Sequence, residues 1–159
     1  MICARKYFFY QKNPIFSYMI RVDQEFQKLS LSGHTFIFAS GDSGVSCKDG
    51  NTRQSPDFPA SSPHVLTVGG VVDTGTAFPR SWSLSGGGFS DVFAAPAFMN
   101  SAVSAYLSNP ANKVPPSSFF NITGRPYPSL AAVSENVAIF LGGYEYTGNK
   151  HAVIFLFFF

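Results

Sequence analysis

The hydrophobic positions of the chain follow two different spacings, and the first predicts a helix. Between Arg21 and Ser32 the apolar residues Val22, Phe26 and Leu29 lie three or four positions apart, and Gly33 follows. This spacing is typical of an amphipathic helix, and glycine is a common residue just past a helix end. We therefore predict a helix over residues 21–32.

The second spacing consists of short, continuous apolar runs, which predict buried strands. His34–Ala39 is apolar and β-branched with a glycine close to either end, and Val65–Val68 is closed by Gly69 and Gly70. Such runs between turn residues are typical of strands buried on both faces of a parallel sheet. A helix followed by a strand, a Gly-, Asp- and Pro-rich loop over 41–63 and another strand predicts an α/β fold.

The rest of the chain is less regular. Val71 and Val72 are expected to extend the second strand, and Ser85–Gly88 allows another segment to approach the backbone closely. A short helix is predicted over 100–107, which ends before Asn-Pro at 109–110. Residues 114–128, rich in proline, are predicted to form an irregular connector.

Composition and charge restrict the possible partners. The chain has 159 residues, of which 45% are hydrophobic and 13% charged, a balance that fits one globular domain. The net charge of +2 comes from scattered lysines and arginines, so the sequence predicts neither nucleic-acid binding nor a polybasic membrane patch.

The two ends of the chain differ from its middle. Residues 1–20 mix aromatic side chains with Arg5, Lys6 and Lys12, so they contain no uninterrupted apolar stretch of signal-peptide or membrane-span length. Residues 152–159 are almost wholly apolar but too few to cross a bilayer. We therefore expect no membrane span and find no signal-peptide pattern.

Cysteines and a glycosylation sequon provide weak signals. The two cysteines, Cys3 and Cys47, can form one disulfide, but Cys3 lies in the atypical terminal stretch, so Cys47 is expected to lack its natural partner or to be free. Asn121-Ile122-Thr123 is a sequon, and Asn121 would be glycosylated only if the chain enters the secretory route.

The strongest candidate for chemistry is the turn at residues 40–44, Ser-Gly-Asp-Ser-Gly, which directly follows the first predicted strand. Ligands of open α/β sheets bind at the carboxyl ends of strands, where Asp42 is expected to face a substrate from the tip of a central strand. The alternative is a structural turn in which Asp42 bonds its own backbone.

Several blocks, taken in order, carry a resemblance. Residues 38–44 (Phe-Ala-Ser-Gly-Asp-Ser-Gly) are followed by Phe-Pro-Ala-Ser-Ser-Pro at 58–63, by Val-Leu-Thr-Val-Gly-Gly at 65–70 and by Ser-Gly-Gly-Gly-Phe-Ser at 85–90. This order resembles the sedolisin, or serine-carboxyl peptidase, family. The segment from 115 to 128 is most similar to the tripeptidyl-peptidase I branch. The resemblance covers about residues 21–134, which we expect to form a partial peptidase domain between an atypical N-terminal stretch (1–20) and a divergent apolar tail (135–159).

The resemblance implies an α/β fold, here an incomplete subtilisin-like fold with a mainly parallel sheet flanked by helices. It also implies a Ser, Glu and Asp triad, with a further Asp in the oxyanion hole, and this last role falls on Asp42. A carboxyl must be protonated to donate a hydrogen bond to an oxyanion, so such an enzyme works at acid pH. By analogy with subtilisin-like folds, the substrate pocket is expected to involve the following residues: Ser40, Gly41, Ser43, Phe58 and Pro59. Ser85–Ser90 could line a cleft or form a structural turn.

The other catalytic groups of the family are not found in this sequence. Asp23 and Glu25 lie two positions apart, whereas the family's Glu and Asp need four to share a helix face. There is no Gly-Thr-Ser to supply the nucleophile, and the family's calcium site is expected in a more C-terminal part, so we predict no metal ligands and no cofactor in this chain. A catalytic role for His34 is disfavoured because a histidine at a strand edge is more often structural, and His64 is expected to be a surface or capping side chain.

We therefore predict a fragment of a serine-type peptidase that acts on peptides or unfolded proteins at acid pH and is inactive as this chain. The resemblance implies a lysosomal or secreted location. Two alternatives stay open: a noncatalytic peptide-binding remnant that pairs with the missing remainder of the fold, and a mispredicted gene model of a complete enzyme.

Overall fold

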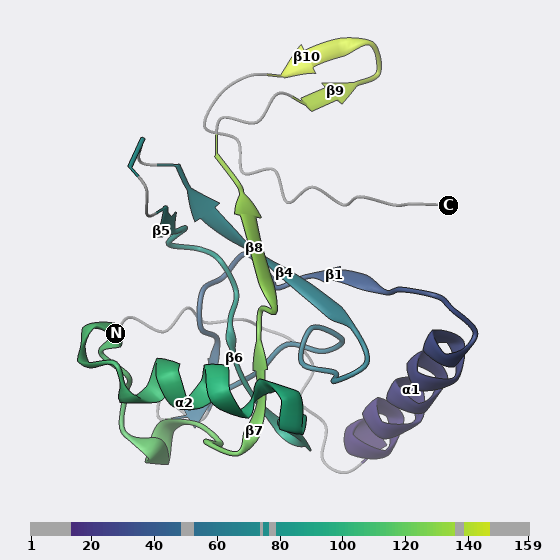
Figure 1. Ribbon diagram of the computed structural model, residues 1–159. Coiled ribbons are helices and arrows are strands. Elements are labelled where there is room, and N and C mark those ends of the chain that lie inside the picture. The colour runs from purple at the N-terminus through teal and green to yellow at the C-terminus, as the bar shows by residue number, and fades with distance from the viewer. Residues whose placement is uncertain (1–13, 49–52, 74, 77–78, 136–138, 147–159) are drawn as a thin grey trace.

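The computed structural model describes residues 14–48, 53–73, 75–76, 79–135 and 139–146 (Figure 1). Its longer elements are α1 (Pro14–Leu31), β1 (Ile37–Ala39), β4 (Leu66–Val72), β6 (Gly88–Ala94), α2 (Asn100–Ser108), β7 (Gly124–Tyr127) and β8 (Leu130–Val133). The shorter ones are β2 (Cys47–Lys48), β3 (Arg53–Gln54), β5 (Arg80–Ser81), β9 (Ile139–Leu141), β10 (Tyr144–Tyr146) and the 3-10 turns η2 (Ala97–Met99), η3 (Pro110–Asn112) and η4 (Ser117–Phe119).

Helix α1 begins at Pro14, earlier than the predicted start at Arg21. Proline suits the first turn of a helix because its missing N–H would have no partner there. The helix buries Met19, Asp23 and, in part, Phe26, which recur at helical spacing. The predicted end is confirmed, because Gly33 adopts φ 90° just past the last turn.

The central sheet is mainly parallel. The middle strand, β4, pairs in parallel with β1 through Val68–Ala39 and with β8 through Val68–Leu130. Because Val68 pairs with both, β1 and β8 lie on opposite sides of β4. The antiparallel strand β5 extends the β1 side through Val71–Ser81. The predicted α/β class is confirmed, but β1 lies at the rim of the sheet among the described residues, whereas its tip was expected to be central.

Helix α1 packs against the β1 side of this sheet through aromatic rings. Phe26 lies 5.0 Å from Phe36 and 5.6 Å from Phe38, measured between ring centroids. Tilted rings at this separation add an attraction of about 0.5–1.5 kcal/mol per pair to the burial of their surface. This aromatic contact therefore fixes the helix beside the strand that carries residues 40–44.

A second, antiparallel pair is formed by β6 and β7, with a bulge between Phe89 and Ala94. At Gly124 an added Cβ would lie 1.9 Å from the carbonyl oxygen of Ser90, so only glycine allows this approach. Helix α2 lies in front of this pair in Figure 1. The pair was not expected, because β7 falls within the proline-rich connector predicted to be irregular.

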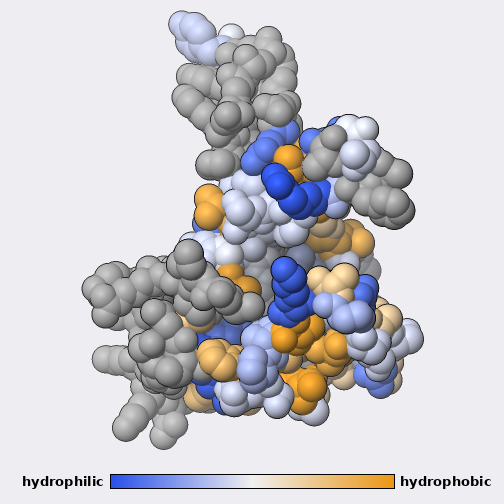
Figure 2. Space-filling model, turned by 90° about the vertical axis from the view of Figure 1, so that its left-hand side faces the viewer, coloured by the Kyte–Doolittle hydropathy of each residue, from blue (hydrophilic) through white to orange (hydrophobic). Residues whose placement is uncertain are grey.

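Apolar side chains also reach the surface. Phe98, Leu130 and Val133 are exposed by 78%, 55% and 46% of their areas. On the face drawn in Figure 2, hydrophobic residues (orange) lie beside hydrophilic ones (blue) over the lower part of the molecule. Among the described residues, no helix has the length and apolarity needed to cross a membrane.

Candidate active site

The turn formed by residues 40–44, called here the Asp42 turn, leaves the carboxyl end of β1. Ser40 is buried, and its N–H donates to the Val68 carbonyl over 2.9 Å, which continues the β1–β4 ladder by one residue. Gly41 and Gly44 then adopt φ of 102° and 59°, values that favour glycine. The chain can therefore reverse immediately after the strand and present Asp42 at the sheet edge.

The Asp42 turn is held by residues 84–88, called here the Gly86 loop. The Gly86 N–H donates to the Gly41 carbonyl over 2.7 Å, and the Gly44 N–H donates to the Leu84 carbonyl over 2.8 Å. A Cβ on Gly86 would lie 1.9 Å from the carbonyl oxygen of Ser40. Two motifs far apart in the sequence thus meet backbone to backbone, and this contact requires glycine at position 86.

The side chain of Asp42 itself is exposed. Within the described part of the chain, its carboxyl has no hydrogen-bond or ion-pair partner. The expected orientation towards a substrate cleft is therefore not supported by any contact of the carboxyl, although the backbone beneath it is fixed. The oxyanion role of Asp42 stays a prediction.

The other predicted pocket residues lie in two places. Ser40, Gly41 and Ser43 belong to the Asp42 turn, where Gly41 and Ser43 are half-buried. Phe58 precedes Pro59 through a cis peptide bond, and its ring stacks on Phe93 with centroids 6.3 Å apart. The structure therefore places Phe58 against β6, and none of these five residues lines the large cavity described below.

A cluster that sequence analysis did not find joins α1 to the loop before β4. Asp23 is only 8% exposed, accepts a hydrogen bond from Ser62 Oγ over 2.5 Å and lies 3.0 Å from His64 Nδ1. These are the residue types of a serine-protease triad, but the connections differ, since the serine bonds to the carboxylate and not to the imidazole. Ser62 is also fully buried. The cluster therefore anchors the helix and does not provide the missing nucleophile.

Arg125, at the start of β7, is another buried polar residue, exposed by 2%. Its guanidinium donates to the carbonyls of Ala60 and Val65 over 3.0 and 3.1 Å and to Ser129 Oγ over 2.8 Å. These bonds fasten the loop before β4 to the β7–β8 connection. Burial lowers the pKa of Arg125, because desolvation disfavours its charged form.

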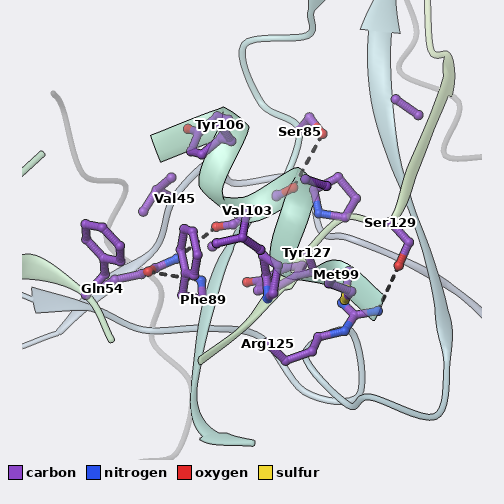
Figure 3. A pocket seen from close by; sticks show the side chains of 18 of the residues that line it. Val45, Gln54, Ser85, Phe89, Met99, Val103, Tyr106, Arg125, Tyr127 and Ser129 are labelled. Atoms are coloured by element: carbon purple, nitrogen blue, oxygen red, sulfur yellow. Dashed lines mark hydrogen bonds between the residues drawn. The ribbon is translucent and has the colours of Figure 1, made fainter. Parts of the chain in front are cut away.

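A cavity of about 1130 Å³ opens between α2, the β6–β7 pair and the sheet. Figure 3 shows Val103 and Tyr106 of α2 on one side and Gln54, Phe89 and Tyr127 on another. Gln54 is held in its wall by donating to the Gly87 carbonyl over 3.1 Å. Its location between the Gly86 loop and β7 makes this cavity a neighbour of the Asp42 turn.

The remaining predictions concern modification, redox state and metals. Asn121 is half-buried, its amide nitrogen donates to the Ser90 carbonyl over 3.0 Å, and its glycosylation stays a prediction. Cys47 is in a disulfide, so the possibility that it is free is wrong; the other cysteine, Cys3, lies outside the described residues. The described residues contain no group of three or more His, Cys, Asp or Glu that could hold a metal ion.

His34 stands apart from these groups. Its Nδ1 lies 3.2 Å from the carbonyl of Leu29, in the last turn of α1. A histidine there interacts favourably with the free carbonyls of a helix end. This contact agrees with the structural role expected for His34.

Comparisons with known proteins agree with the motif-based resemblance. No family model matches the chain. It is 44% identical over 129 residues to tripeptidyl-peptidase 1 of Bos taurus and 43% identical over 129 residues to that of Homo sapiens. Each alignment covers 75% of this chain and 22% of the relative, so the chain spans about a fifth of the length of these relatives.

A solved structure shows the same fold. Pseudomonas sedolisin, a serine-carboxyl proteinase complexed with two molecules of pseudo-iodotyrostatin, superposes with a TM-score of 0.50 at 22% identity. The match covers 80% of this chain and 36% of the sedolisin chain. The resemblance is confirmed: the chain carries a segment of the serine-carboxyl peptidase, or sedolisin, family that is homologous to part of tripeptidyl-peptidase 1, in a partial subtilisin-like fold.

Proposed function

We propose that this chain is a segment of a serine-carboxyl peptidase that acts on peptides at acid pH, in the manner of a tripeptidyl-peptidase, and that Asp42 is its oxyanion-hole carboxyl. The observation that supports the proposal is the pair of backbone hydrogen bonds, called here the clamp, that joins the Asp42 turn to the Gly86 loop. It holds the signature turn of the family at the carboxyl end of β1, next to the parallel strand β4.

The chemistry of an oxyanion hole explains why this fixation matters. Hydrogen-bond donors aimed at the developing negative charge lower the barrier only if they need no rearrangement during the reaction. A carboxyl acts as a donor when it is protonated, which favours acid conditions. The two backbone bonds of the clamp fix the Cα of Asp42 in advance, while its exposed side chain is accessible to a peptide carbonyl.

We further propose that the chain alone does not turn over substrate. The sequence lacks the family's Gly-Thr-Ser nucleophile and its Glu-x-x-x-Asp pair. The Asp23, Ser62 and His64 cluster does not replace them, because its serine is buried and bonded to the carboxylate. Without a triad, an oxyanion hole and binding give only about a thousand- to ten-thousandfold acceleration over water.

Measurement of tripeptide release by the purified chain between pH 3 and 6 tests this part of the proposal. We expect no release above that of buffer. Robust release that Asp42→Ala abolishes, and that inhibitors of contaminating proteases do not affect, would contradict the proposed inactivity.

The family resemblance also supports proposals about the cellular location of the protein and about its calcium site. An enzyme whose oxyanion donor is a protonated carboxyl suits a lysosomal or other acidic secretory location. Glycosylation of Asn121 is expected on the same route. We expect the family's calcium site in a more C-terminal part of the fold, outside the described residues.

A further inference from the structure

The cavity beside the Gly86 loop contains a buried cation that the proposed peptidase chemistry does not use. Most of its wall is apolar, and the apolar lining residues include Met99, Val103, Phe119 and Phe89. Apolar walls with a few polar groups are typical of sites for organic ligands. The polar groups therefore decide which ligand fits.

The polar lining is positive. Arg125 and His64 are among the lining residues, whereas no Asp or Glu is. His64 already has a carboxylate partner, because Asp23 Oδ2 lies 3.0 Å from its Nδ1. Arg125 also lines the cavity, but among the described residues its guanidinium donates hydrogen bonds only to uncharged oxygens.

The hydrogen bonding of Arg125 is incomplete. A guanidinium has five N–H donors, and in the described residues three hydrogen bonds are formed, with Nε buried and without a partner. A buried charge is costly unless it is paired. An anion at this position would supply both the missing charge and the missing acceptors.

The surroundings favour a carboxylate over a simple ion. Ser129 Oγ accepts from the guanidinium and keeps its own O–H, which can donate to the same anion. Met99 lines the same cavity, and its flexible thioether side chain can move to admit a ligand. The volume of about 1130 Å³ accommodates an apolar body attached to the anion.

We propose that this cavity binds the C-terminal carboxylate of a peptide with apolar side chains, with Arg125 as the cationic anchor and Ser129 as a second donor. The choice of a peptide among apolar carboxylates rests on the proposed peptidase function. The carboxylate site itself rests on the lining and on the incomplete bonding of Arg125.

Titration calorimetry with two matched probes tests the proposal. N-acetyl-Leu-Leu-Phe with a free carboxylate and the same peptide as its C-terminal amide are titrated into the chain at pH 6, where a terminal carboxyl is ionised. We expect the acid to bind about ten- to a hundredfold more tightly than the amide, the usual effect of a hydrogen bond to a charged group. Equal affinities would overturn the carboxylate site.

Two arginine variants test whether Arg125 causes the preference for the peptide acid over the amide. Arg125→Met should remove the preference for the acid, whereas Arg53→Met, at an exposed arginine paired with Asp91 outside the cavity lining, should retain it. A preference that survives Arg125→Met contradicts the proposal. If Arg125→Met does not fold, Val103→Trp, which narrows the cavity from α2, should weaken binding of the acid at least about tenfold, and unchanged binding overturns the proposal.

A third probe tests whether the cavity prefers a peptide over another apolar carboxylate. Decanoate carries the carboxylate without a peptide, and we expect it to bind at least about tenfold more weakly than the peptide acid. Tighter or equal binding of decanoate overturns the peptide assignment. All these measurements record binding, so absence of peptidase activity does not affect them. A negative binding result would in turn leave the proposed peptidase function intact.

Discussion

Replacement of Gly86 by alanine should release the Asp42 turn from the Gly86 loop. The new Cβ would lie 1.9 Å from the carbonyl oxygen of Ser40, and ordinary contact begins at 3.4 Å, so the two backbones must separate by about 1.5 Å. The bond between the Gly86 N–H and the Gly41 carbonyl, now 2.7 Å long, would then exceed any hydrogen-bond distance.

The expected cost follows from these contacts. Overpacking costs about 1–3 kcal/mol, and each of the two backbone bonds of the clamp contributes about 0.5–1.5 kcal/mol, so unfolding should become easier by about 2–6 kcal/mol. Urea denaturation followed through Trp82, the single tryptophan and only 4% exposed, measures this change.

Gly33→Ala is the matched control. Gly33 has φ 90° and nothing within 4 Å of an added Cβ, so the cost comes from backbone strain alone, about 1–2 kcal/mol. If Gly86→Ala lowers the free energy of unfolding no more than Gly33→Ala does, the contact between the Asp42 turn and the Gly86 loop does not have the stabilising role assigned to it.

Two further variants test other contacts. Asp23→Ala leaves Ser62 Oγ buried without its acceptor and should cost about 1–3 kcal/mol in urea unfolding, whereas Glu25→Ala, on the exposed face of α1, should change little. Burial raises the pKa of Tyr127, so the folded chain keeps its phenol neutral while the unfolded chain ionises above about pH 10. Stability should therefore be unaffected below that pH and fall above it; Tyr127→Phe should reduce the fall, and Tyr106→Phe, at an exposed tyrosine, should not. Equal slopes for both tyrosine variants would contradict the assignment.

The elements that the sequence predicted are those with a clear local pattern. The helix over 100–107 is observed as α2, and the two apolar runs are observed as β1 and β4. Strands β7 and β8 were missed because prolines at 126 and 128 suggest a connector, while their pairing depends on distant partners. The early start of α1 was missed because residues 14–20 are apolar or aromatic at nearly every position, which leaves no helical alternation of apolar and polar residues.

The candidate site likewise has one part that the sequence predicted and other parts that it did not. The Asp42 turn could be found because its motif is contiguous. Its contact with the Gly86 loop could not be found, nor could the pairing of Asp23 with His64, 41 positions away, because no local pattern encodes contacts between distant segments. The buried Arg125 gave no signal either, since its acceptors are mostly backbone carbonyls.

The proposed function depends most on Asp42 as an oxyanion donor, and a chimera tests this role directly. Residues 21–134 replace the homologous segment of a tripeptidyl-peptidase 1, and kcat for tripeptide release at acid pH is compared between this chimera and its Asp42→Ala variant. We expect an active chimera whose kcat falls about a hundred- to a thousandfold in the variant. A folded chimera without activity, or one whose kcat does not change on loss of the Asp42 carboxyl, would contradict it.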